Sequence, residues 1–284
     1  MRNKHRLRAS SFDLLSTYNY FTPGWIDFLW IGISLFIGVL LSGLVGIALN
    51  KAGFEPIYIQ LISYPILFIP SMLLASSLSR RNMFRDKENP LDKNNYWSVK
   101  QVLIATISML AAGFVIDGIN LILPPMPEDL KEVMLTLKEG PVWVSILCVG
   151  IFAPFMEEWL CRGIILRGLL GKINAPAALI ISALFFGVIH GNIWQGVPAF
   201  FIGILLGFIY YKSGSLKLTM CMHAIHNLVA LTLMKIPSLE AAETYFDIFP
   251  SVWTYGIAMT ASIVITTLTV IYFARLKRPE EVSE

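Results

Sequence analysis

Long apolar runs alternate with short polar segments along this chain. A transmembrane helix needs roughly 20 mostly apolar residues, and the runs that approach this length lie at residues 25–49, 57–79, 99–123, 141–172, 175–191, 196–212, 216–235 and 251–275. The fifth run is short and the seventh is broken by histidines, so seven spans are the alternative to eight. The pattern predicts an all-α fold: a polytopic membrane protein with a bundle of about eight transmembrane helices.

The composition agrees with a fold whose surface faces lipid. Of the 284 residues, 56% are hydrophobic and 14% are charged, whereas soluble domains carry roughly 25% charged residues. We expect a single transmembrane domain at residues 25–276, with its motif-bearing core at 141–235. Residues 1–24 are expected to form a cytoplasmic or interfacial segment, and residues 277–284 a cytoplasmic tail. The expected partner is the lipid bilayer, and no nucleic-acid partner is expected.

Lysine and arginine are distributed unevenly between the two sides of the predicted bundle. If the N-terminus is cytoplasmic, the inside segments hold 18 of these residues and the outside segments hold 4. Cytoplasmic loops carry the excess of positive charge in membrane proteins, so we predict that both termini are cytoplasmic. The short chain, which shows no organelle signal, favours a prokaryotic inner membrane.

Residues 128–139 follow a different pattern. Leu130, Val133, Met134 and Leu137 recur at helical intervals among charged residues, which is typical of an amphipathic helix on a membrane surface. We expect a short helix at the outer interface, with a solvated loop as the alternative.

Several ionisable or strongly polar residues lie inside the predicted spans. A charged group near the bilayer centre costs at least about 2.5 kcal/mol, which makes such a residue a functional candidate. The candidates are Asp117, Glu157, Glu158, Arg162, His190, His223, His226 and Asn227.

Glu158 and Arg162 are four residues apart, so we expect them to pair on one helix face. Glu157 is turned by about 100° from Glu158 and has Cys161 at its own i+4 position. It is therefore the freer carboxylate and the better candidate for a general base. The alternative is that both glutamates only hold helices together.

The fourth and fifth spans are predicted to form a hairpin. Its turn falls near Lys172, with Asn174 as the N-cap of the following helix and Pro176 in the first turn. Glu157 lies 16 residues before Ile173 and His190 lies 16 residues after Asn174, so an antiparallel hairpin brings these two residues to about the same level. Without this levelling, His190 would be interpreted as an interfacial histidine.

On the seventh span, His223 and Asn227 share a helix face and His226 is rotated away. His223 is about 12 Å above the cytoplasmic end of its helix and Glu157 about 15 Å above Arg167, at 1.5 Å per residue. One buried site open to the cytoplasm can therefore collect Glu157, His190, His223 and Asn227.

These four residues fit hydrolysis of a peptide bond. A buried carboxylate takes a proton from water, a histidine orients the water or binds a metal, and a histidine with an amide stabilises the oxyanion. Asp117 is interpreted mainly as a structural partner, with a direct role as the alternative. Cys161 and Cys221 lack a basic i+4 neighbour and are poor candidates for a nucleophile.

Three short motifs carry a family resemblance. They are Glu157-Glu158-Trp-Leu-Cys-Arg162, Phe186-Gly-Val-Ile-His190 and His223-Ala-Ile-His-Asn227. They resemble the EExxxR, FxxxH and HxxxN motifs of the CAAX protease and bacteriocin-processing family, the Abi-type membrane proteins that include the Ras-converting endopeptidase. They occur in the right order on apolar helices, within residues 157–227. His226 occupies a variable position of the third motif and is left unassigned.

The resemblance implies an eight-helix intramembrane endopeptidase acting on a membrane-associated or lipid-modified peptide or protein. Glu157 and His190 would activate water, His223 and Asn227 would complete the site, and Glu158 and Arg162 would support it.

Such proteins are commonly called metalloproteases, but the motifs lack the HExxH zinc signature. Zinc held by Glu157, His190 and His223 and a metal-free, glutamate-driven mechanism both remain open. A proton- or ion-coupled transporter and a non-catalytic membrane scaffold are the rival functions. Transporters tend to show inverted repeats, whereas the ionisable residues here cluster in the second half of the chain.

Overall fold

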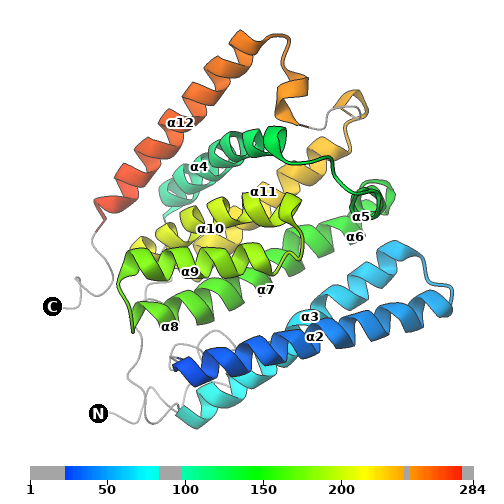
Figure 1. Ribbon diagram of the computed structural model, residues 1–284. Coiled ribbons are helices and arrows are strands. Elements are labelled where there is room, and N and C mark those ends of the chain that lie inside the picture. Colours follow the sequence, from blue (N-terminus) through cyan, green and yellow to red (C-terminus); the bar gives the residue numbers. More distant parts are fainter. Residues whose placement is uncertain (1–22, 83–97, 240–243, 277–284) are drawn as a thin grey trace.

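The computed structural model describes residues 23–82, 98–239 and 244–276, and all regular structure in these ranges is helical (Figure 1). The all-α prediction is therefore confirmed. Most of the predicted N-terminal segment at 1–24, and the predicted tail at 277–284, lie outside the described residues.

Seven helices in the described part of the chain are long and apolar enough to cross a membrane. They are α2 (Trp25–Lys51), α3 (Pro56–Asn82), α4 (Val99–Asp117) with its 3-10 extension η3 (Gly118–Ile122), a composite helix at Val142–Leu170, α10 (Ile193–Ser213), α11 (Leu216–Met234) and α12 (Val252–Ala274). An eighth apolar helix, α9 (Ala175–Val188), has 14 residues. Short 3-10 turns, η6 (Pro237–Leu239) and η7 (Tyr245–Ile248), lie between α11 and α12.

The amphipathic helix predicted at 128–139 is present with those bounds as α5 (Glu128–Glu139). Its buried residue Leu137 packs against Ile57 of α3 and against Val144. The ammonium group of Lys235, just after α11, donates to the carbonyl of Lys138 and lies 3.3 Å from that of Gly140. A lysine thus satisfies carbonyls left open at the end of α5.

The composite fourth helix alternates between two hydrogen-bonding patterns. It runs through α6 (Val142–Ser145), the π-helix η4 (Ile146–Phe152), α7 (Ala153–Glu158), the π-helix η5 (Trp159–Leu166) and α8 (Arg167–Leu170). π-helical segments are rare and are frequently found at functional sites. The two glutamates of the first motif lie at the end of α7, directly before the second π-helical segment.

The composite helix and its neighbours form the middle of the molecule. In Figure 1, the α2–α3 hairpin lies on one side of this central group, and α4 and α12 lie on the other. Between them, α9 packs on α10 and on η5, while α11 packs on α4, α7 and η4. All eight residues of η5 are buried. The segment that follows the two glutamates is therefore shielded from lipid by the rest of the chain.

The α9–α10 hairpin differs in detail from the sequence prediction. The helix predicted at 175–191 ends at Val188, and the one predicted at 196–212 begins at Ile193, because the Asn192 side chain accepts the N–H of Gln195 and caps α10. Gly191 turns the chain with φ +71°, a conformation that favours glycine. His190 therefore lies in the turn rather than at the end of a helix.

Candidate active site

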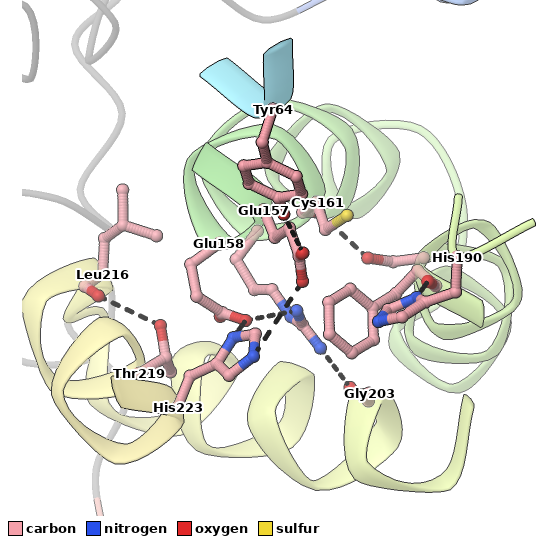
Figure 2. Close-up of polar contacts among 12 residues, drawn as sticks. Tyr64, Glu157, Glu158, Cys161, His190, Gly203, Leu216, Thr219 and His223 are labelled. Atoms are coloured by element: carbon pink, nitrogen blue, oxygen red, sulfur yellow. Dashed lines mark hydrogen bonds and ion pairs between the residues drawn. The ribbon is translucent and has the colours of Figure 1, made fainter. Parts of the chain in front are cut away.

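The predicted pair of Glu158 and Arg162 is present, and Figure 2 shows Glu158 next to Glu157 and His223. Arg162 Nη1 lies 2.5 Å from Glu158 Oε1, and both side chains are fully buried. Burying either charge alone would be far more costly than burying the pair. The i,i+4 spacing thus permits two charges to sit inside an apolar bundle.

Arg162 also connects the composite helix to the α9–α10 hairpin. Its Nη2 donates to the carbonyl of Gly203 on α10 at 3.0 Å, and its guanidinium lies 4.3 Å from the centre of the Phe186 ring on α9. A cation over an aromatic face at this distance is attractive. A Cβ at position 203 would lie 3.1 Å from the Phe186 ring, so glycine permits the close approach of α10.

His223 brings α11 to both glutamates. Its Nδ1 lies 3.1 Å from Glu158 Oε1, and its Nε2 lies 3.9 Å from Glu157 Oε2. Since the Glu158 carboxylate accepts, Nδ1 carries a hydrogen, and in the neutral imidazole Nε2 is the unprotonated nitrogen. Glu158 therefore orients His223 so that its acceptor nitrogen faces Glu157.

The two carboxylate oxygens of Glu157 differ in their hydrogen bonding. Oε1 accepts the hydroxyl hydrogen of Tyr64, which comes from α3. Oε2 is buried without a hydrogen-bond partner among the described residues. Tyr64 was not among the candidate residues predicted from the sequence. Its signal was a tyrosine within an apolar span rather than at the membrane interface, where tyrosines usually gather.

His190 faces the same cluster from the α9–α10 turn (Figure 2). Its Nδ1 lies 2.7 Å from the carbonyl of Phe186, and because a carbonyl only accepts, that nitrogen is the donor. The Phe186 ring packs edge-on against both His190 and His223, with ring centres 5.1 and 5.6 Å apart. Asn192 fixes the turn by donating to the carbonyl of His190 at 3.0 Å.

The hairpin register explains how His190 reaches this position. The equal spacing assumed in the sequence prediction would place Cys161 opposite Phe186. In the structure, the residue next to Cys161 is Ser182, whose hydroxyl donates to the Cys161 carbonyl at 2.9 Å. The levelling of Glu157 with His190 is therefore wrong by about one turn, since the i→i+5 bonding of η5 takes more residues per turn. The His190 side chain bonds to the carbonyl of Phe186, one turn earlier, and so extends back toward the level of Glu157.

Asn227 lies on the same helix as His223, but its side-chain amide bonds to the composite helix and not to the glutamates. Asn227 Nδ2 donates to the carbonyl of Val149 at 2.9 Å. That carbonyl lacks its helical partners, because the N–H of Ala153 goes to Cys148 and Pro154 has no N–H. Asn227 thereby satisfies an orphan carbonyl of η4 and anchors α11 to the composite helix.

Asp117 lies outside this cluster. Its carboxylate accepts the backbone N–H of Tyr245 at 2.7 Å and the side-chain amide of Asn120 at 2.9 Å. Burial, and after it the charge of Asp117, raises the pKa of the Tyr245 phenol. These contacts fit the interpretation of Asp117 as a structural partner that fixes the segment before α12.

His226 points away from the glutamates. A Cβ at Gly113 on α4 would lie 2.5 Å from the His226 ring, so this imidazole packs against the α4 backbone where only glycine leaves room. The expected rotation of His226 away from His223 is confirmed by this contact.

The described residues do not form a ready metal site. No group of three His, Cys, Asp or Glu side chains among them is placed to hold a metal ion. The Nδ1 atoms of His190 and His223 both bond to protein oxygens, an arrangement that is also usual for histidines that bind a metal through Nε2. Zinc bound by Glu157, His190 and His223 stays a prediction, which a chelator titration of cleavage activity tests.

Comparisons with known proteins agree with the motifs. The family described as Type II CAAX prenyl endopeptidase Rce1-like matches residues 139–229, a segment that contains all three motifs. A protein of Bacillus subtilis (strain 168) named "Putative membrane peptidase YdiL" is 22% identical over 234 residues, which cover 77% of this chain and 92% of that protein. No solved structure matches the chain significantly.

Proposed function

We propose that this chain, whose residues 139–229 match the Rce1-like CAAX prenyl endopeptidase family, is an intramembrane endopeptidase that cleaves a membrane-associated or lipid-modified substrate. The observation that carries the proposal is the position of His223. One of its nitrogens is held by Glu158, and the other faces the open oxygen of Glu157 at 3.9 Å. A general base beside an oriented imidazole, in a buried setting, is a recurrent arrangement for activating water.

Glu157 Oε2 and His223 Nε2 are placed to bind the attacking water. One water molecule at ordinary hydrogen-bond lengths of about 2.8 Å bridges two acceptors separated by 3.9 Å. In the proposed reaction Glu157 Oε2 takes one proton from this water while its oxygen forms a bond to the carbonyl carbon of the substrate. The tetrahedral intermediate then breaks its C–N bond, and the leaving nitrogen takes the proton from Glu157.

The surrounding groups keep this chemistry feasible inside the bundle. Glu158, placed between Arg162 and His223, stabilises the imidazole if it acquires positive charge. We propose that His190 lines the other side of the reacting carbonyl and assists the water. Asn227 contributes by holding α11, and with it His223, at the composite helix.

We further propose that cleavage occurs near the cytoplasmic face of a prokaryotic inner membrane, with both chain termini in the cytoplasm. The excess of lysine and arginine on the predicted inner side supports this orientation. A substrate anchored by a lipid or a short hydrophobic segment would present its cleavage site at this depth.

The test is cleavage of a library of membrane-anchored and lipid-modified peptides by purified protein in detergent, with products identified by mass spectrometry. Glu157→Gln and His190→Ala should each lower the rate by roughly 10²- to 10⁴-fold, the usual contribution of a general acid or base. Glu132→Gln, an exposed carboxylate on α5, is the control. Equal cleavage by all variants would contradict the roles proposed for Glu157 and His190. No cleavage by the unmodified protein would contradict the proposal and favour a non-catalytic scaffold.

A further inference from the structure

Tyr64 connects the proposed site to a part of the chain outside the matched family segment. It lies on α3, 93 residues before Glu157 in sequence, and its hydroxyl donates to Glu157 Oε1. The family match begins at residue 139, and none of the three motifs includes an α3 residue. The contact is therefore an addition to what the motifs describe.

The packing of Tyr64 holds its hydroxyl in place. Its ring lies 5.5 Å from that of Phe68, one turn later on α3, in a tilted arrangement. It also packs against the buried cluster that contains Trp159 and Leu160. A ring fixed on two sides has few rotamers left, so the hydroxyl is presented to Glu157 with little remaining freedom.

The hydrogen bond distinguishes the two oxygens of Glu157. A carboxylate on a flexible side chain presents either oxygen to its surroundings. Here Oε1 is held by Tyr64, and Oε2 is the oxygen that faces His223 Nε2. With Tyr64 absent, Oε1 would be buried without a donor, and the carboxylate would be free to rotate away from His223.

We propose that Tyr64 is a positioning residue, whose hydroxyl fixes the Glu157 carboxylate with its second oxygen toward His223 and so makes α3 part of the active site. This inference rests on the proposed function for its effect on cleavage, while the hydrogen bond itself can be tested without any substrate. It assigns a role to the N-terminal half of the chain that goes beyond covering the core.

The first experiment is a double-mutant cycle on thermal stability in detergent, with Tyr64→Phe, Glu157→Ala and the double variant. Tyr64→Phe should lower the Tm of the unmodified protein, because it leaves a buried carboxylate oxygen unpaired. In the Glu157→Ala background the same change should leave the Tm equal or higher, because it removes a hydroxyl that has already lost its acceptor. Equal shifts in both backgrounds would overturn the inference, whatever the protein cleaves.

The second experiment measures kcat and KM for the same variant on a substrate that the unmodified protein cleaves. Tyr64→Phe should lower kcat about tenfold or more with KM nearly unchanged, since it disturbs the reacting carboxylate and leaves the substrate contacts in place. Tyr58→Phe is the matched control: it lies on the same helix and its ring contacts Trp143. Both kinetic constants should be unchanged in that variant.

The outcomes separate the inference from the proposed function. Stability coupling with unchanged kcat in Tyr64→Phe would overturn the positioning role, while a loss of cleavage in Glu157→Gln would still support the peptidase. If the unmodified protein cleaves nothing, the proposed function and the kinetic role of Tyr64 both fail, and the stability cycle alone reports a structural hydrogen bond.

Discussion

The composite fourth helix and the last helix, α12, are both apolar enough to span a membrane, but their surroundings differ. In the most apolar stretch of Val142–Leu170, 67% of the residues are buried inside the protein, against 11% in α12. The composite helix carries two glutamates and two arginines, whereas α12 carries no charged residue. Charges occur in a span where protein, rather than lipid, provides the neighbours.

The comparison shows what the polar residues of the inner helix depend on. Glu158 and Arg162 are supplied with partners by α10 and α11, namely the Gly203 carbonyl and His223. Close backbone contacts at glycines bring these partners within reach. α12 carries no charged side chain that needs a partner, so its sequence needs only to be apolar and helical.

The largest stability effect is expected from breaking the buried ion pair. Arg162→Leu leaves Glu158 buried without its arginine and removes the bond to the Gly203 carbonyl, and should cost about 3–5 kcal/mol of stability. Lys51→Leu, an exposed residue in the last turn of α2, should have little effect. Thermal unfolding in detergent measures both. Equal small shifts would mean that the inner charges do not support the bundle.

A smaller loss is expected from separating α9 and α10. A Cβ at Gly187 would lie 2.7 Å from the carbonyl oxygen of Gly196, so Gly187→Ala must push the helices apart and should cost about 1–3 kcal/mol. Gly43→Ala on α2, where nothing lies within 4 Å, is the matched change at the periphery. It should be neutral or slightly stabilising, and a comparable loss at both sites would remove the distinction drawn from packing.

The smallest effects should be alike in the two regions. Ser182 donates to the Cys161 carbonyl in the core at 2.9 Å, and Ser42 donates to the Ser63 carbonyl between α2 and α3 at 2.8 Å. Such bonds contribute about 0.6 kcal/mol each in membrane proteins. Ser182→Ala and Ser42→Ala should therefore lower stability by similar small amounts. A much larger loss at Ser182 would show that single hydrogen bonds also distinguish the core.

Local sequence patterns were sufficient for the helices and for half of the site. The apolar runs placed the spans, the Asn174 cap placed the hairpin turn, and four-residue spacing paired Glu158 with Arg162. Each of these relations lies within one helix or one turn, where spacing fixes geometry.

The rest of the site depends on contacts between distant segments. Tyr64 meets Glu157 across 93 residues, and no periodicity marks such a partner. The hairpin register differs from equal spacing by about one turn, with η5 lying between Glu157 and the turn. The free Val149 carbonyl that binds Asn227 exists only because η4 departs from α-helical bonding. These features come from tertiary packing.

The two histidines of α11 provide the most direct test of the central claim. His223 faces Glu157 and Glu158, whereas His226, three residues later, packs on Gly113. The measurement is the cleavage rate of one substrate by His223→Ala and His226→Ala, with both variants confirmed to be folded. We predict a loss of roughly 10²- to 10⁴-fold for His223→Ala and a nearly unchanged rate for His226→Ala. Equal rates for the two variants would contradict the assignment of this buried cluster as the active site.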